Sequence, residues 1–243
     1  MSESSAPKIR KIIDPPKPDN KSIHPNLPQP HAQVLMVMPC KCGKSTIGSN
    51  LIMNSDFYGL DYFDSPPMVI SNTINTDLTN RFLKKCCDTY DRYDDSIIHN
   101  FVANQKKYGE AQNQPKACVF IDDCLGDKTS ALDSLSSRYR HSNIHLMLIS
   151  TQLFRKVSPV IRANATNILI GKLQNARELD KLDEEYGGMF NGKLRDLYNQ
   201  ATKKKYDFLH LNLQENPAEA WINFETKIYP LNNNNNDNED DSE

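Results

Sequence analysis

The chain has 243 residues, of which 25% are charged and 38% are hydrophobic, and its formal net charge is −2. This length suits one α/β domain with polar tails. No apolar run approaches the roughly 20 residues that a membrane-spanning helix requires, so the composition excludes an integral membrane protein built on such helices.

The two ends of the chain differ in composition from its centre. Residues 1–30 combine many prolines with scattered basic residues, a pattern typical of an extended arm that either docks on a partner or stays solvated. Residues 231–243 hold an asparagine run followed by acidic residues and are predicted to be disordered. We expect one folded domain over residues 31–230. It is slightly basic, too weakly to indicate nucleic acid binding by itself.

The cysteines and the N-terminus bear on the compartment. The N-terminus is polar and contains prolines, so we expect no secretory signal. The six cysteines are spaced neither as a disulfide framework nor as a zinc site, which favours reduced thiols in a cytosolic setting. Cys40 and Cys42 could be sensitive to oxidation, but ordinary loop residues are the preferred interpretation.

The first predicted elements surround a phosphate-binding loop. An apolar strand over Val34–Met38 leads into a tight loop, and a helix over Ser45–Met53 follows. In such a loop the backbone N–H groups surround a polyphosphate, the lysine reaches the β- and γ-phosphates, and the serine hydroxyl holds Mg²⁺. The sequence therefore predicts ATP and Mg²⁺ as ligands, with the nucleotide held by Pro39, Cys40, Lys41, Cys42, Gly43, Lys44, Ser45 and Thr46.

One position departs from the full phosphate-loop pattern. The pattern has glycine six residues before the lysine, and here that place is Met38. Glycine permits a backbone turn that a side chain makes harder, although Pro39 could preset part of it. A chance Gly-Lys-Ser match in an ordinary loop is the alternative interpretation.

Further elements alternate between strand and helix along the chain. The helix from Asp77 is expected to be capped by Asn75 or Thr76. Predicted strands are Pro67–Ser71, Ala117–Asp122, Ile144–Gln152, Asn167–Ile170, Tyr206–Leu213 and Ala220–Ile228, and predicted helices are Asp77–Tyr90, Ile97–Lys107, Ser130–Tyr139, Arg177–Glu185 and Lys193–Thr202. This alternation predicts an α/β fold of the P-loop NTPase class, with a mainly parallel sheet flanked by helices.

Polar residues at two strand ends are the candidate chemical groups. Ligands of α/β sheets lie at the carboxyl ends of strands, so Asp122 is expected beside the phosphate loop as the Mg²⁺ carboxylate. Asp123 is then the candidate that orients or polarises the attacking water. Gln152, at the end of the next strand, is placed to sense the γ-phosphate or its water. An Asp-rich turn and an ordinary polar strand end are the alternatives.

These residues carry a family resemblance that spans roughly residues 25–230. The chain resembles genome-packaging ATPases of the FtsK–HerA superfamily, in the poxvirus-like branch, and is most similar to the virophage members. The resemblance lies in four segments, which are Gly43-Lys44-Ser45-Thr46, Asp122-Asp123, Arg140-His141-Ser142-Asn143 leading to Ser150-Thr151-Gln152, and Val160-Ile161-Arg162-Ala163-Asn164-Ala165. It implies a RecA/FtsK–HerA-like fold and a homo-oligomeric ring, a pentamer or a hexamer. Such a ring hydrolyses ATP to thread double-stranded DNA into a preformed capsid.

The resemblance also implies partners and a location, and the chain departs from the family pattern at two positions. Capsid vertex proteins and double-stranded DNA are the expected partners, without a membrane, in the virion or in the host cytoplasm at a viral factory. Met38 replaces the first loop glycine, which could weaken nucleotide affinity. Asp123 stands where much of the superfamily has glutamate, one methylene longer. Since Lys44, Ser45 and Asp122 remain, we expect activity to survive.

Basic residues supply the remaining candidates. A ring motor usually completes its site with an arginine from the next subunit, and Arg140 or Arg162 is the candidate finger. The alternatives are a surface guanidinium for Arg140 and a helix-face salt bridge for Arg162. DNA contact is expected from basic loops, with Lys203-Lys204-Lys205 the densest cluster and Lys84-Lys85 and Lys106-Lys107 weaker ones, against a solvated position for each.

Two other functions compete with the motor. A small-molecule P-loop kinase would usually carry a basic lid over the phosphates, and no arginine-rich lid is evident in the sequence. The other alternative takes Met38 as a sign of decay and predicts a nucleotide-binding or degenerate structural component of the packaging vertex without robust hydrolysis. The joint presence of five residues argues against decay, namely Lys44, Ser45, Asp122, Asp123 and Gln152.

Overall fold

A computed structural model describes residues 23–76, 81–124 and 129–230. Most of the expected N-terminal arm, the whole of the tail at 231–243 and the first residues of the helix predicted from Asp77 lie outside these ranges. Residues 23–30, assigned to the arm from sequence, pack against the domain. Ile23 and Leu27 are buried there, and Tyr58 donates a hydrogen bond to the carbonyl of Pro28 at 2.6 Å.

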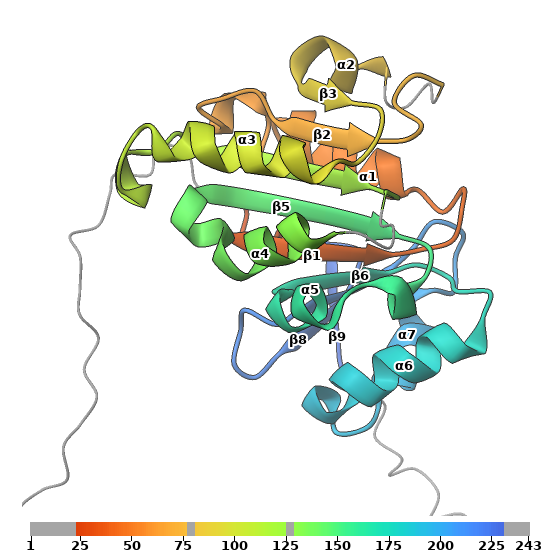
Figure 1. The fold of residues 1–243 in the computed structure, drawn as a ribbon. Helices are drawn as coiled ribbons and strands as arrows, with labels where there is room; N and C mark the ends of the chain where they lie inside the picture. Colours follow the sequence, from red (N-terminus) through yellow and green to blue (C-terminus); the bar gives the residue numbers. More distant parts are fainter. Residues whose placement is uncertain (1–22, 77–80, 125–128, 231–243) are drawn as a thin grey trace, which may run out of the picture.

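One nine-stranded sheet organises the described residues, in the order β3-β2-β4-β5-β1-β6-β7-β8-β9 (Figure 1). The six strands from β3 to β6 in this order pair in parallel, and β7 to β9 continue the sheet in antiparallel fashion. The strands are β1 (Ala32–Val37), β2 (Met68–Ser71), β3 (Asp88–Tyr90), β4 (Ala117–Asp122), β5 (Ile144–Thr151), β6 (Asn167–Ile170), β7 (Leu209–Asn212), β8 (Glu219–Ile222) and β9 (Thr226–Ile228). The predicted mainly parallel α/β sheet is confirmed.

The central strands are buried along their whole length because helices cover both faces. Every residue of β1, β4 and β5 is buried, as expected for parallel strands between two helical layers. The helices are α1 (Lys44–Met53), α2 (Leu83–Cys86), α3 (Asp95–Lys106), α4 (Ser130–Arg138), α5 (Pro159–Asn164), α6 (Ala176–Tyr186) and α7 (Leu194–Ala201). Within the described ranges, no helix is long and apolar enough to span a bilayer.

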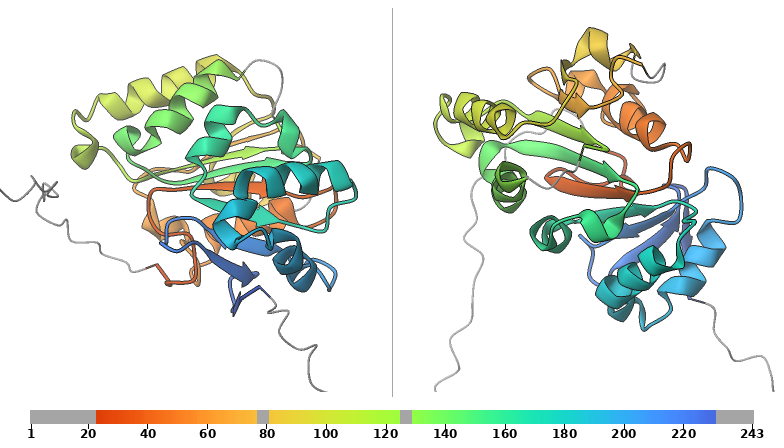
Figure 2. Two further views of the ribbon diagram at one scale, coloured as in Figure 1. Left: turned by 90° about the horizontal axis from the view of Figure 1, so that it is seen from below. Right: turned by 45° about the vertical axis from the view of Figure 1, so that its right-hand side comes forward.

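The helices divide into two layers with separate apolar cores. Side chains of α3 to α7 pack on one face of the sheet, and α1 packs on the other with the segment around Tyr58 and Tyr62 (Figures 1 and 2). Helix α1 lies very close to β4, since a Cβ added to Gly48 would come within 2.6 Å of the Phe120 ring. This close packing fixes the start of α1 relative to the end of β4.

The predicted helix over Asp77–Tyr90 is wrong at its end. Residues 77–80, which include the start that Asn75 or Thr76 was expected to cap, lie outside the described ranges, and the described part contains the short helix α2. Asp88–Tyr90 instead pairs in parallel with β2 as the edge strand. Thr89 and Tyr90 favour extended backbone, and edge pairing overrides the helical pattern of the preceding residues.

The C-terminal strand pair also differs from the prediction. The expected strand over Ala220–Ile228 is two strands, β8 and β9, separated by a turn in which Asn223 has φ 55°. The strand expected from Tyr206 begins only at Leu209, because Tyr206 adopts a left-handed conformation with φ 73° that interrupts the extended backbone.

Candidate functional site

The phosphate loop joins the end of β1 to the start of α1. Its turn is made by Lys41 and Gly43, whose φ values of 62° and 96° lie in the left-handed region. Gly43 precedes the first residue of the helix and carries no side chain that would strain this conformation. Left-handed residues alternating with others turn successive N–H groups toward one side, and the helix N-terminus adds a positive dipole there. The loop is therefore built to receive an anion.

Met38 occupies the place of the first loop glycine without being part of the turn. It is fully buried, and its N–H donates to the carbonyl of Thr151 at 3.0 Å, which continues the pairing of β1 with β5. Its side chain packs against Gly171, where an added Cβ would lie 2.9 Å from Met38 Cγ. Because the turn begins only later, at Lys41, methionine is accommodated at a position where the sequence pattern calls for glycine.

Lys44 is the first residue of α1, and its side chain is 8% exposed. Its Nζ donates to the carbonyl oxygens of Met38 and Pro39 at 2.9 and 3.3 Å, and lies 3.9 Å from Asp123 Oδ2. The ammonium is thus held inside the loop by weak acceptors that a phosphate could replace.

Three neighbouring strands end in polar residues that lie in register. Ser71 of β2 pairs with Asp122 of β4, which pairs with Ser150 of β5. Asp122 accepts hydrogen bonds from the hydroxyls of Ser71 at 3.1 Å, Ser150 at 2.7 Å and Ser45 at 3.1 Å. These donors hold the buried carboxylate beside the serine of the phosphate loop. Sequence analysis did not assign this role to Ser71 and Ser150, although both sit at predicted strand ends.

Asp123 and Gln152 meet above this cluster. Asp123 has φ 53°, and its N–H lies 3.2 and 3.1 Å from the carbonyl and hydroxyl oxygens of Ser150. Gln152 Nε2 donates to Asp123 Oδ2 at 2.5 Å. The left-handed turn carries the second carboxylate away from Asp122 and toward solvent, where it is 37% exposed. The two carboxylates therefore face different partners.

The phosphate loop and the two carboxylates line a cavity of about 820 Å³, and Gln152 is not among its lining residues. The cavity is lined by Pro39, Cys40, Lys41, Gly43, Lys44, Ser45, Thr46, Ile47, Thr73, Asp122, Asp123 and Tyr206. The lining includes all the predicted loop residues except Cys42, together with both carboxylates. Thr73 and Tyr206 were missed by sequence reasoning, since no local motif distinguishes them.

The oxygen donors of this cavity fit Mg²⁺. Ser45 Oγ and Asp122 Oδ2 lie 3.1 Å apart on its wall, and hydroxyl and carboxylate oxygens are the hard ligands that this ion prefers. The remaining Asp122 oxygen is bonded by Ser150, which orients the carboxylate. The residues present therefore suit a nucleotide bound with Mg²⁺.

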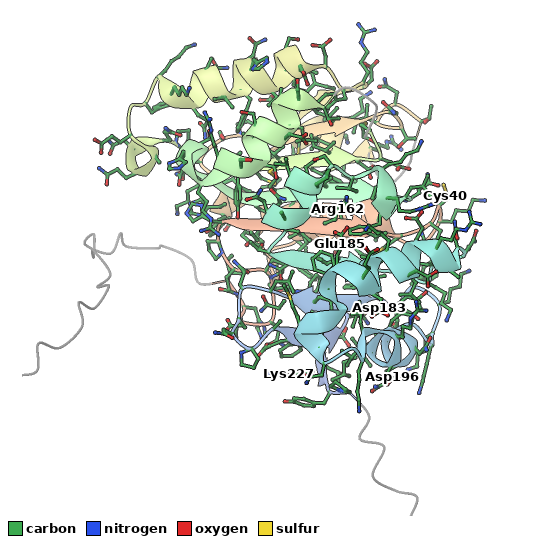
Figure 3. All side chains as sticks on the ribbon, turned by 60° about the horizontal axis from the view of Figure 1, so that its bottom comes forward. Cys40, Arg162, Asp183, Glu185, Asp196 and Lys227 are labelled. Carbon is green, nitrogen blue, oxygen red and sulfur yellow. The ribbon has the colours of Figure 1, made fainter. Side chains whose placement is uncertain are left out.

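The two candidate finger arginines lie apart from this cavity. Arg162, on α5, forms an ion pair with Glu185 of α6 and lies 5.2 Å from the Phe154 ring centroid (Figure 3). Its side chain is 12% exposed. Arg140 is exposed near the start of β5, at the opposite edge of the sheet from the phosphate loop, and its Nε lies 3.4 Å from the Tyr139 hydroxyl.

The basic clusters are exposed but lie at different edges. Lys203, Lys204 and Lys205 precede β7, whose start lies beside the end of β6 and hence near the phosphate loop. Lys106 and Lys107 end α3 at the opposite edge, and Lys84 and Lys85 lie on α2.

All six cysteines are free thiols. Cys40 is exposed on the phosphate loop (Figure 3), and Cys42 beside it is half-buried. Cys124 follows the two carboxylates, and burial raises its pKa to about 11, which keeps this thiol protonated at neutral pH. Cys124 therefore acts as an uncharged packing group in this structure.

Comparison with known proteins identifies the fold. No family model matches the chain. A curated relative, uncharacterized protein 075L of Invertebrate iridescent virus 6, is 28% identical over 127 residues, which are 50% of this chain and 49% of the relative. The match thus spans about half the length of that relative.

A solved genome packaging NTPase and a solved conjugation coupling protein are similar to most of this chain. The genome packaging NTPase B204 from Sulfolobus turreted icosahedral virus 2, in complex with ATP-γS, is 20% identical with a TM-score of 0.54, over 84% of this chain and 100% of that chain. The pCW3 conjugation coupling protein TcpA is 15% identical with a TM-score of 0.54, over 76% of this chain and 57% of that chain. At these identities the likeness establishes the fold. The predicted resemblance to FtsK–HerA packaging ATPases is confirmed at that level.

Proposed function

We propose that this chain is an ATP-hydrolysing motor that moves double-stranded viral DNA into a preformed capsid. The observation that carries the proposal is the convergence of Lys44, Ser45, Asp122 and Asp123 on one cavity beside a phosphate loop. The packaging NTPase B204, which shares the fold, has been captured with the nucleotide analogues ATP-γS and AMPPCP. By analogy, this chain acts with capsid vertex proteins, in the virion or in the host cytoplasm.

Nucleotide binding begins with the loop backbone and Lys44. The N–H groups around Lys41 and Gly43 receive the phosphates, and the dipole of α1 favours their negative charge. Lys44 then exchanges the carbonyls of Met38 and Pro39 for phosphate oxygens, which are stronger acceptors for an ammonium. The side chain needs only to leave neutral acceptors, so binding costs little reorganisation.

Hydrolysis is assigned to the second carboxylate. Phosphoryl transfer depends mainly on positioning and on stabilising charge, so Asp123 orients the attacking water and Gln152 holds that carboxylate through its 2.5 Å hydrogen bond. Ser45 and Asp122 would hold Mg²⁺, which would neutralise charge on the phosphates. Lys44 adds a second positive charge on the same side. Gln152 thereby links the γ-phosphate region to β5.

A subunit ring completes the site in this proposal. Arg162 is engaged by Glu185 within its own chain, whereas Arg140 is exposed at the opposite edge of the sheet. In a ring in which the amino ends of one subunit's parallel strands face the carboxyl ends of the next subunit's strands, Arg140 would face the neighbouring subunit's cavity. We therefore favour Arg140 as the finger. Arg140→Ala should bind ATP normally and lose about 10³-fold or more in turnover. Arg162→Ala is the comparison, and unchanged turnover in both variants would exclude both fingers.

DNA contact is assigned to the basic segment before β7. Lys203 and Lys204 are exposed at the same edge as the nucleotide cavity, where a change in nucleotide state could reach them. Contacts to phosphates release counterions, so each lysine lost should lower the salt dependence of DNA binding by about one unit of slope. The double variant Lys203→Ala/Lys204→Ala tests this in a DNA-binding titration over several salt concentrations.

Displacement of a triplex-forming strand from linear double-stranded DNA tests translocation directly. The proposal predicts ATP-dependent displacement by the assembled protein and none with Lys44→Ala or with a non-hydrolysable analogue. Robust ATP turnover without displacement would leave an NTPase of the same fold that is not a DNA translocase.

A further inference from the structure

One aromatic residue lies on the wall of the nucleotide cavity although it is far from the phosphate loop in sequence. Tyr206 lines the cavity together with Ile47 and Lys44. The sheet topology explains this placement. Strand β7 runs antiparallel to β6, with Leu209 opposite Ile170, and Ile170 is paired with Val37 at the end of β1. The segment before Leu209 therefore reaches the same edge of the sheet as the loop after β1.

Tyr206 is held in an unfavourable backbone conformation. Its φ of 73° is in the left-handed region, which is uncommon for a bulky residue, and its side chain is 60% exposed. Such residues persist where the surroundings hold them and are frequent at ligand-binding positions. Here the segment is held from the turn between β8 and β9. Asn223 bonds the carboxylate of Asp207 and the N–H of Phe208, both at 3.1 Å.

The Tyr206 ring has a lysine ammonium over one of its faces. Lys205 Nζ lies 4.8 Å from the ring centroid, over one face. A cation on one face leaves the opposite face for a planar group, and bases stack on such faces whatever their identity. Ile47 supplies an apolar contact on the same cavity wall. The cavity thus has a phosphate region around Lys44 and a separate aromatic region.

We propose that Tyr206 is the nucleobase platform of this site, on which the base of a nucleoside triphosphate stacks while its phosphates occupy the loop. The inference rests on the proposed nucleotide-binding function and adds a specificity to it. Stacking on a tyrosine depends on the aromatic face of the base and not on its hydrogen-bonding groups, so the site should bind ATP and GTP with similar affinity. The ring belongs to the β7 side of the sheet, so base binding would also couple the nucleotide to the lysines that precede it.

Calorimetric titration of the full chain with MgATP and with magnesium tripolyphosphate separates the two regions. Tyr206→Gly suits the test because glycine adopts a positive φ without strain, so the backbone conformation at this position should be kept. Its ATP affinity should fall by about 5- to 100-fold, the usual range for one lost base stack, with tripolyphosphate affinity unchanged. Tyr206→Trp should restore ATP affinity.

Tyr108→Ala is the matched control, since Tyr108 is 59% exposed and does not line the cavity. It should leave both affinities unchanged. Equal ATP affinity in Tyr206→Gly and the original protein would overturn the base platform while leaving the phosphate site intact. An equal loss of ATP and tripolyphosphate affinity would overturn it too, because the ring would then act on the phosphates. If the original protein bound neither ligand, the proposed function itself would fail.

Discussion

Polar side chains are buried both at the carboxyl ends of the parallel strands, here called the carboxyl edge, and at their amino ends, the amino edge. The two groups of side chains have different hydrogen-bond partners. At the carboxyl edge, three hydroxyls converge on the single carboxylate of Asp122, and this cluster opens onto a cavity. At the amino edge, the polar groups bond backbone carbonyls or one another. Gln105 Nε2 donates to the carbonyls of Ser142 and Pro115 at 2.8 and 3.0 Å, which closes the loops that enter β4 and β5.

The amino edge also contains a buried aromatic and histidine pair. Tyr62 OH lies 2.6 Å from His145 Nδ1, and His145 Nε2 lies 3.1 Å from Asn143 Oδ1. Asn143 Nδ2 in turn donates to the carbonyl of Gln114 at 2.6 Å. These bonds satisfy polar groups where chain segments enter the sheet, so their role is structural.

The contrast shows that buried polarity alone does not identify a functional site. What distinguishes the carboxyl edge is a charge held by exchangeable partners on the wall of a cavity. Lys44 and Asp122 are both bonded to groups that a nucleotide and its cation could replace. At the amino edge, replacing a partner would open a loop.

Among the variants at the carboxyl edge, Lys44→Ala should give the largest effect. It removes the positive charge nearest the phosphates, and loss of one such electrostatic group costs about 10²–10³-fold in turnover. The matched control is Lys106→Ala, an exposed lysine at the amino edge. Steady-state phosphate release should fall only in the first variant. Equal turnover in the two variants would contradict the assignment of the nucleotide site to the carboxyl edge.

Ser150→Ala should give a smaller and more specific effect. Its hydroxyl orients Asp122, and losing such a supporting bond typically lowers metal affinity by about 10- to 100-fold. The Mg²⁺ concentration needed for half-maximal turnover should rise, and excess Mg²⁺ should rescue the rate. Ser142→Ala, a buried serine at the amino edge, should leave this concentration unchanged. A lower rate that Mg²⁺ does not rescue would contradict the assigned role.

The core between the edges supplies a pH test of stability. Burial lowers the pKa of His210, on β7, from 6.5 to about 3, and its Nδ1 has no hydrogen-bond partner within the described residues. Below pH 6.5 His210 is protonated in the unfolded chain but stays neutral in the folded chain, so the free energy of unfolding falls as the pH falls. At pH 5 the loss should be about 2 kcal/mol.

His210→Gln should remove that loss, since glutamine can bond Asn167 without titrating. Urea unfolding at pH 8 and pH 5 measures it, and His99→Gln, at an exposed position, is the control that should keep the original pH dependence. Unaltered acid sensitivity in His210→Gln would show that other groups control it.

Local patterns predicted the elements that position the phosphate loop and the two carboxylates. The strands ending at Val37, Asp122 and Thr151 each contain an apolar run of four or five residues, which identifies them from the sequence alone. Asp88–Tyr90 was mispredicted because its strand depends on a neighbour, β2, rather than on its own burial. Tyr206 was missed as a cavity residue because only the antiparallel return of β7 brings it to the loop.

The roles of Ser71 and Ser150 lie between these cases. Both serines end predicted strands, but their convergence on Asp122 depends on strand order and register, which single-strand patterns do not contain. The same holds for Met38. Its sequence suggests a damaged loop, whereas its burial against Gly171 depends on the end of β6.

The most direct test of the account is ATP turnover by the purified, assembled protein with and without linear double-stranded DNA. We predict measurable turnover that DNA stimulates. High salt should remove the stimulation by DNA, and Lys44→Ala should lower the turnover by about 10²–10³-fold. Absence of turnover in both conditions, from folded and assembled protein, would contradict the assignment of the carboxyl edge as a hydrolytic site.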